Sequence, residues 1–445
     1  MCFSVLFFVY IMLSRIDIQN ILKLLRKEVL RAIGGNEKRM VALACAKARE
    51  VLGQDPEMVK AKLSSYIIKY AMGVGIPNTG GMVGIPAAIA LGSLAGNSEL
   101  GLDLLKNITP DDCVRAKQFV ADKRWTVVTA RNTFEVVYAE VKAIAGDHQV
   151  KVIIAKDYAN VVYIKRDNEV LFDELCSLAT EHDRNHESDL TIAKIYEFAT
   201  KCPLDSLQFL LKGAQMNKKV AEMAYLPDAD YGLNLGKMLK GEFESRMVGQ
   251  NAMPRVVSYT CAACDVRMSG VSVPISTNSG SGNQGITISL PILIFAEETL
   301  CTEAKTIRAL TIGNLVNIYI RQLLGKLSAH CSCVLSATGA ACGITYLMGG
   351  SYEQITYAVK NQLAGATGMI CDGCKPSCVL KLSSAVSSAF QSAMMAMENI
   401  HVASTDGIIE DDVDKCIDNL ASIGRDAMLE VDNVVLNIMT DKHFF

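Results

Sequence analysis

The amino-acid sequence predicts an α+β protein, made of a predominantly helical body with a small antiparallel β-sheet subdomain. Long segments at both ends of the chain repeat apolar residues at helical spacing, as in residues 16–33. Between about residues 125 and 172 the pattern changes to β-branched runs separated by short polar turns, which is typical of an antiparallel meander. The abundance of Ala, Gly and Ser favours closely packed helices.

The N-terminal third contains several segments with helical spacing. They are residues 16–33, 37–52 and 57–72, a small-residue helix beginning near Ala87, and a helix after the capping sequence Thr109-Pro-Asp-Asp. Helices return at about 189–201 and 204–245. We therefore expect five parts. They are an apolar extension (1–15), a helical part of the body (16–124), an antiparallel β subdomain (125–175), a helical segment (176–250) and a small-residue-rich helical part that carries the cysteine stretches (251–445).

Composition excludes some classes of protein. The 445-residue chain has a net charge of −3, so no basic surplus indicates a nucleic-acid binder. Fifteen cysteines in a large chain with helical patterns do not fit a small secreted disulfide scaffold. We expect the thiols to be reduced, the protein to be cytoplasmic, and most cysteines to be buried as small apolar residues.

The chain starts with the apolar run MCFSVLFFVYIML. This run is too short to span a bilayer, and it lacks the basic residue and the cleavage site of a signal peptide. We expect a loosely attached or non-native extension, with Met12 as an alternative start, and no stable membrane insertion. A membrane-associating segment is the alternative.

Five cysteines lie in two short stretches. Cys331 and Cys333 occur in LSAHCSCVL, and Cys371, Cys374 and Cys378 occur in GMICDGCKPSCVLK. Thiolates suit zinc and iron–sulfur clusters, but this spacing matches neither a zinc ribbon nor a ferredoxin. From spacing alone, a metal site, buried inert thiols and a redox disulfide remain open.

Two glycine-rich loops could bind an anion. STNSGSGNQG, at residues 276–285, offers many backbone N–H groups and precedes an apolar run that should be buried. IPNTGGMVGIP, at 76–86, opens a helix whose N-terminus could receive an anion. The alternatives are a plain surface loop and a tight interhelical turn. The charged surroundings of His182 and His186 indicate a solvated loop rather than a metal site. For His330, we expect a packed side chain rather than one that adjusts the protonation of a nearby cysteine ligand.

Three segments together resemble the iron–sulfur L-cysteine desulfidase family, which is related to the α chain of bacterial iron–sulfur L-serine dehydratase. They are NTGGMVGIPAAIALGSLAGN, DVRMSG with STNSGSGNQGITISLPI, and GMICDGCKPSCVLKLSSA; LSAHC also fits. The resemblance covers almost the whole chain from about residue 16.

This resemblance implies a [4Fe-4S] cluster with three cysteine ligands, which carry over to Cys331, Cys371 and Cys378. Cys333 and Cys374 do not fall on ligand positions. The implied reaction is α,β-elimination from L-cysteine to pyruvate, ammonia and hydrogen sulfide, with one open iron acting as a Lewis acid. The candidate donors to the substrate carboxylate are Thr79, Gly80, Asn278, Ser279, Gly280, Ser281 and Asn283.

Two departures from the family pattern bear on catalysis. The family's Gly-Cys-Thr-Glu-Pro motif appears here as Gly34-Gly35-Asn36-Glu37-Lys38, so the cysteine implied in acid–base catalysis is Gly35. The family's Asn-Gly after Lys69 appears as Tyr70-Ala71. The alternatives are therefore a catalytically impaired paralogue that binds a cluster or an amino acid, an L-serine dehydratase, and a structural zinc site. A small amino acid is the expected partner, and a homo-oligomer remains open.

Overall fold

The structure is a computed structural model that describes residues 13–33, 35–76, 79–130, 133, 135–175, 189–241, 252–325 and 328–441. Our expectations for residues 1–12 and for His182 and His186 lie outside the described residues.

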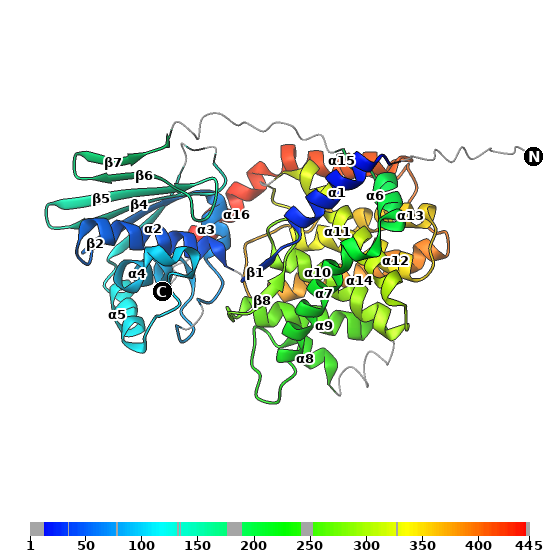
Figure 1. Cartoon of the computed structure of the whole chain (residues 1–445), viewed down its shortest axis with the longest axis horizontal. Coiled ribbons are helices and arrows are strands. Elements are labelled where there is room, and N and C mark those ends of the chain that lie inside the picture. The colour runs from blue at the N-terminus through cyan, green and yellow to red at the C-terminus, as the bar shows by residue number, and fades with distance from the viewer. Residues whose placement is uncertain are drawn as a thin grey trace, which may run out of the picture.

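Two hydrophobic cores organise the chain (Figure 1). One core joins a six-stranded sheet to the helices of the N-terminal third, and it extends from Met40 to Ile154, with Leu436 added from the C-terminal helix. The other core fills the helical body, with residues from Ile21 to Val29 and from Leu190 onward, together with Val74. The predicted α+β class is confirmed, but the sheet shares its core with the helices that precede it in sequence.

The sheet has the strand order β3-β2-β4-β5-β6-β7. Its strands are β2 (Met58–Leu63), β3 (Trp125–Thr129), β4 (Tyr138–Ala145), β5 (His148–Ala155), β6 (Val161–Arg166) and β7 (Glu169–Asp173). The antiparallel meander predicted over residues 125–172 is present as β4 to β7, but its first run, β3, pairs in parallel with β2 and lies outside the meander. β2 runs antiparallel to β4 but parallel to β3, so the complete sheet is mixed.

The prediction of a helix over residues 57–72 is wrong for its first half. In β2, Val59, Ala61 and Leu63 are buried and alternate with more exposed residues, which is the period of a strand. Only the second half is helical: α3 (Ser65–Ala71) begins where the Ser64 hydroxyl accepts a hydrogen bond from the Ile67 N–H.

Three further helices cover the sheet on one side: α2 (Asn36–Leu52), α4 (Gly84–Ala95) and α5 (Pro110–Ala121). α2 packs on β4 and β5, α4 packs on α2, and α5 packs on α4. The predicted cap of α5 is confirmed, because Thr109 and Asp112 form a reciprocal capping box. This layering fixes the start of α2, which faces the helical body (Figure 1).

The helical body is built around α12, which contacts α10, α11, α13 and α14. Its helices are α1 (Arg15–Glu28), α6 (Ile192–Lys201), α7 (Gln208–Met223), α8 (Leu235–Lys240), α9 (Ala252–Met268), α10 (Gly282–Glu298), α11 (Glu303–Leu324), α12 (Ser332–Leu347), α13 (Tyr352–Ala366), α14 (Cys378–Met397) and α15 (Val413–Ser422). Among the described residues, none of the helices combines the length and apolarity needed to cross a bilayer.

Two connections join the parts. The helix predicted over 16–33 ends at Glu28, because the chain then extends into β1 (Arg31–Ile33), which pairs antiparallel with β8 (Pro274–Ser276). This pairing brings the start of α2 beside the loop that follows β8. At the other end, α16 (Leu429–Asp441) reaches the sheet part, where Asp432 pairs with the buried Lys69 and Leu436 joins the core.

Gly373 allows the loop before α14 to approach α3 closely. Its φ is +92°, and a Cβ there would overlap the carbonyl oxygen of Lys69. Gly349 has a nearly identical φ of +93° but has nothing within 4 Å of a Cβ, so it is a matched control. Both Gly→Ala variants carry the strain of a left-handed backbone, and only Gly373→Ala adds the overlap.

We predict that Gly373→Ala lowers the free energy of unfolding by about 1–3 kcal/mol more than Gly349→Ala does, because backbone must move to relieve the overlap. Urea unfolding followed by circular dichroism measures the difference. Equal losses in the two variants would contradict the close approach.

Candidate functional site

A cavity lies where the two cores meet, and both parts of the chain line it. The sheet side contributes side chains from α2 and α3, and the body contributes residues around the N-termini of α10, α12 and α14. The polar, aromatic and cysteine residues of the lining, together with two glycines, include Gly35, Glu37, Lys38, Tyr66, Tyr70, Arg267, Ser279, Gly280, Ser281, Asn283, Arg321, Cys331, Cys333, Cys371, Cys374, Cys378 and Lys381. All five cysteines singled out in the sequence therefore face one space.

A short antiparallel bridge brings Cys331 and Cys371 together. His330 pairs with Ile370, the Cys331 N–H donates to Met369 O at 2.9 Å, and the Cys371 N–H donates to Ala329 O at 2.6 Å. The two thiols lie close enough for each to shift the pKa of the other. Backbone pairing, rather than a sequence motif, thus places two cysteines from distant segments side by side.

Two of the three expected ligands sit at helix N-termini. Cys331 is the N-cap of α12, and Cys378 is the first residue of α14. The positive end of a helix stabilises negative charge, and thiolates at such positions are favoured over those elsewhere. The helices that begin at these residues therefore favour the thiolate form of Cys331 and Cys378.

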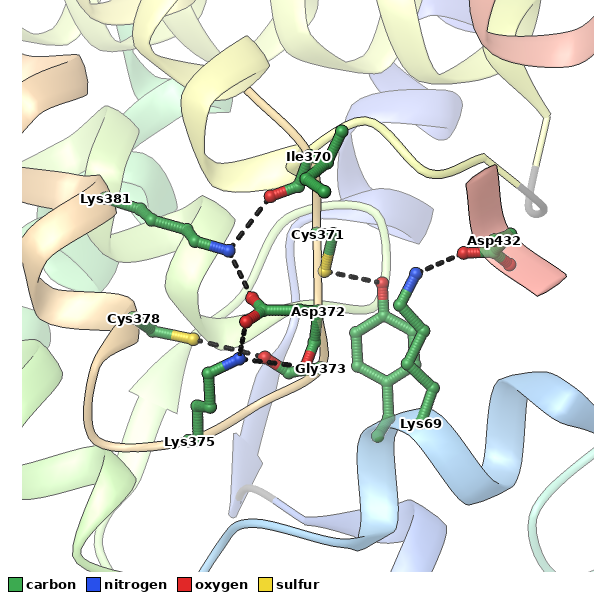
Figure 2. Close-up of polar contacts among 10 residues, drawn as sticks. Lys69, Ile370, Cys371, Asp372, Gly373, Lys375, Cys378, Lys381 and Asp432 are labelled. Carbon is green, nitrogen blue, oxygen red and sulfur yellow. Dashed lines mark hydrogen bonds and ion pairs between the residues drawn. The ribbon is translucent and has the colours of Figure 1, made fainter. Parts of the chain in front are cut away.

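Lysines on one side hold the loop between Cys371 and Cys378 in shape (Figure 2). Asp372 pairs with both Lys375 and Lys381, and Lys381 Nζ also donates to Ile370 O at 2.9 Å. Burial alone would raise the pKa of Asp372, but the two ammonium groups outweigh it and lower this pKa to about 2. On the other side of the loop, Lys69 pairs with Asp432 (Figure 2).

Burial and contacts among the thiols keep them in the neutral form. Contact with the Cys333 thiol raises the pKa of Cys331 to about 12, with contact to Cys371 acting against this shift and burial adding to it. Contact with Cys331, together with burial, raises the pKa of Cys371, and burial raises that of Cys378. Buried thiols grouped in this way are a soft donor set whose thiolate forms a bound cationic iron would stabilise, so these residues fit an iron–sulfur group.

Within the described part of the chain, no three or more His, Cys, Asp or Glu side chains are arranged to hold a single metal ion. A four-iron cluster binds its cysteines at separate iron atoms, so its ligands need not surround one common point.

Two half-buried arginines complete the polar part of the wall. Arg267, on α9, donates through Nη1 to Asn283 Oδ1 at 2.9 Å, and Arg321, on α11, donates through Nη1 to Ser332 Oγ at 3.4 Å. In both, Nε is buried and has no hydrogen-bond partner among the described residues. Unused buried donors on two guanidinium groups suit a small anion such as a carboxylate. Sequence reasoning missed both arginines, although Arg267 lies in the DVRMSG segment.

The loop of residues 276–285 lies where the sequence predicted, at the start of the buried helix α10. Ser279, Gly280, Ser281 and Asn283 line the cavity. Asn278 does not, because its side chain is fully buried in a network with Asn314 and Asn317. That amide supports the loop from behind.

The other expected carboxylate donors lie elsewhere. The Thr79 hydroxyl donates to Ile76 O at 2.7 Å, and the exposed Gly80 is not among the described residues that line the cavity. The structure therefore does not bring these two residues to the cysteines. His330 is buried against Gly424, as expected for a packed histidine.

Two tyrosines of α3, Tyr66 and Tyr70, line the cavity on the sheet side. The Tyr70 hydroxyl lies 3.5 Å from Cys371 Sγ, and its ring stacks obliquely on Tyr66 at 4.7 Å between centroids. Tyr158 joins them: its hydroxyl donates to Glu37 Oε1 and lies 3.3 Å from the Tyr66 hydroxyl. Burial raises the pKa of Tyr70, so it stays protonated.

Three positions at which the sequence departs from the expected motifs line this cavity. They are Gly35, Lys38 and Tyr70, which lie there together with Cys333 and Cys374, whereas Asn36 and Ala71 are not among the described residues that line it.

A cavity between the two cores that is lined by thiols and guanidinium groups is typical of a small-molecule site of the enzyme type. The family described as "Serine dehydratase alpha chain" matches residues 99–437. A UPF0597 protein of Bacteroides thetaiotaomicron is 48% identical over 95% of this chain and 98% of its own length. A UPF0597 protein of Phocaeicola vulgatus is 48% identical over 97% of this chain and 99% of its own length.

A more distant UPF0597 protein, from Oleidesulfovibrio alaskensis, is 39% identical over 94% of this chain and 97% of its own length. The chain belongs to the serine dehydratase alpha-chain family, among its UPF0597 proteins.

Proposed function

We propose that this chain is a lyase that eliminates sulfide from L-cysteine, giving pyruvate, ammonia and hydrogen sulfide. The observation that carries the proposal is that Cys331, Cys371 and Cys378 line one cavity together with Arg267 and Arg321. Family membership supports lyase chemistry on a small β-substituted amino acid.

We infer that Cys331, Cys371 and Cys378 hold a [4Fe-4S] cluster. When bound, such a cluster supplies an open iron that acts as a Lewis acid towards the substrate's sulfur. The chain positions the three thiols: Cys331 at the start of α12, Cys371 on the backbone bridge and Cys378 at the start of α14. The ion pairs of Asp372 keep the loop between Cys371 and Cys378 in place.

The substrate carboxylate is assigned to Arg267. Its unused Nε and its bond to Asn283 provide a charged donor and a neighbouring amide in one place. Ser279, Gly280 and Ser281 border the same space. The backbone N–H groups of Ser279 and Ser281 donate to Glu28 O and Asn278 O, and the Ser279 hydroxyl donates to Asn278 Oδ1, so the Ser281 hydroxyl is the loop's candidate side-chain donor. Anchoring the carboxylate there orients the Cα–H and Cβ–S bonds relative to the cavity walls, which is the main contribution of a binding site to such a reaction.

The thiols point to a reducing compartment such as the cytoplasm. All cysteines in the described ranges are free, and most are buried. Reduced thiols are the form that binds iron.

Turnover by anaerobically purified protein tests this function. We expect bound iron and acid-labile sulfide, with release of sulfide and pyruvate from L-cysteine. Cys331→Ala, Cys371→Ala and Cys378→Ala should each lose iron and activity, because each removes one of three ligands. Cys374 lines the same cavity but is not an expected ligand, so Cys374→Ala is the matched control and should keep its iron.

A colourless, zinc-loaded wild-type protein would contradict the cluster. Bound iron without release of sulfide would favour a binding protein, as the glycine at position 35 suggested. Faster release of pyruvate from L-serine than from L-cysteine would reassign the substrate.

Arg267→Gln tests the carboxylate assignment. Losing a charged hydrogen-bond donor costs about 1.5–3 kcal/mol, so we expect KM for L-cysteine to rise about 10–100-fold. Arg255→Gln is the control, since Arg255 lies on the same helix and pairs with Glu298 without lining the cavity. An unchanged KM in Arg267→Gln would refute the assignment.

A further inference from the structure

Lys38 occupies the space that Gly35 leaves open. Gly35 is the N-cap of α2 with φ +88°, and Lys38 lies in the first turn of the same helix. A Cβ on Gly35 would lie 2.6 Å from Lys38 Cε, well inside contact distance. The lysine side chain therefore lies where a side chain on residue 35 would displace it.

The amine of Lys38 is buried and lacks an acidic partner. The side chain is 3% exposed, and Nζ donates to the carbonyl oxygen of Gly75. Among the described residues no carboxylate is paired with it, whereas Lys381, the other lysine of the wall, is paired with Asp372. Once neutral, the Lys38 amine can keep its bond to Gly75 and still present a lone pair to the cavity.

The surroundings favour that neutral form. Burial lowers the pKa of Lys38 to about 7; Glu37 acts against this shift, Arg267 and Arg39 add to it, and an ionised Cys374 would act against it. The first turn of a helix is also the positive end of its dipole, which disfavours an ammonium. A large fraction of the protein then carries a free amine at neutral pH.

We propose that Lys38 is the catalytic base that removes the Cα proton of the substrate. This inference rests on the elimination proposed above and names the group that performs its proton transfer. Lys38 enters the cavity from α2, whereas Arg267 enters from α9 in the other part of the chain. A carboxylate held by Arg267 therefore leaves the adjacent Cα–H bond open to a base from the opposing wall.

The step balances without another reactant. The Nζ lone pair forms an N–H bond with the Cα proton, the C–H electrons form the Cα=Cβ bond, and the Cβ–S electrons leave with sulfur as hydrosulfide. The substrate ammonium gives one proton to the departing hydrosulfide, which leaves as hydrogen sulfide, and the neutral aminoacrylate remains. The Lys38 ammonium returns its proton to Cβ of the aminoacrylate, which becomes the iminium ion and leaves the Lys38 amine neutral. Water then hydrolyses the iminium ion to pyruvate and ammonium.

Lys38→Met tests the proposal, because methionine fills similar space but cannot accept a proton. We expect kcat to fall about 10²–10⁴-fold with little change in KM or iron content, as for loss of a general base. Lys360→Met is the matched control: Lys360 is 6% exposed and also donates to a backbone oxygen, that of Asp411, but it does not line the cavity. Its kcat should stay within about threefold of wild type.

The pH profile and chemical rescue distinguish a base from a structural residue. Since the neutral amine is the active form, kcat/KM of the wild type should rise as the pH increases through about 7. Added ethylamine should restore part of kcat to Lys38→Ala, and the rise should move to the higher pKa of ethylamine.

Gly35→Ala adds a test of how Lys38 is seated. As a single substitution, Gly35→Ala should lower kcat. In the double variant Gly35→Ala/Lys38→Ala, kcat should be no lower than in Lys38→Ala, because both changes remove the same amine from the cavity.

The outcomes separate this inference from the proposed function. If the wild type releases no sulfide, both fail together. If the wild type turns over while Lys38→Met keeps its kcat, or while ethylamine leaves Lys38→Ala unchanged, only the assignment to Lys38 is overturned.

Discussion

The site depends on a short backbone pairing between two loops of the helical body. The bonds from the Cys331 N–H to Met369 O and from the Cys371 N–H to Ala329 O join the entry to α12 with the entry to α14. Because α12 contacts four other helices of the body, the position of Cys331 is fixed by the whole core. The backbone pairing places Cys371 next to Cys331. Cys378 is placed in turn because the ion pairs of Asp372 with Lys375 and Lys381 hold the loop between Cys371 and Cys378.

The cavity has one wall from each part of the chain. The cysteines belong to the body, whereas Gly35, Lys38 and Tyr70 lie at the start of α2 and on α3 on the sheet side. We therefore expect a substitution on the sheet side to act on proton transfer and on the surroundings of Cys371 without breaking the backbone bridge of the body. The pair Gly35 and Lys38 illustrates this, since the missing side chain of one makes room for the amine of the other.

Sequence reasoning predicted the features that depend on local pattern and on long motifs. The meander, the cap of α5, the buried helix after STNSGSGNQG and the gathering of the cysteines all follow from residues close together or from the family resemblance. It missed β2, because a six-residue strand next to a helix has too few periods to be separated from it. It also missed Arg267 and Arg321, whose role arises only when distant helices face the same space.

We propose that Cys331, Cys371 and Cys378 hold a cluster with one iron open to the substrate. Mössbauer spectroscopy of anaerobic protein enriched in the active iron isotope, with and without L-cysteine, distinguishes an open iron from cysteine-bound ones. We expect L-cysteine to change the signal of one iron and to leave the other three, which the cysteines would hold, nearly unchanged. A spectrum that saturating L-cysteine leaves unaltered at every iron would contradict it.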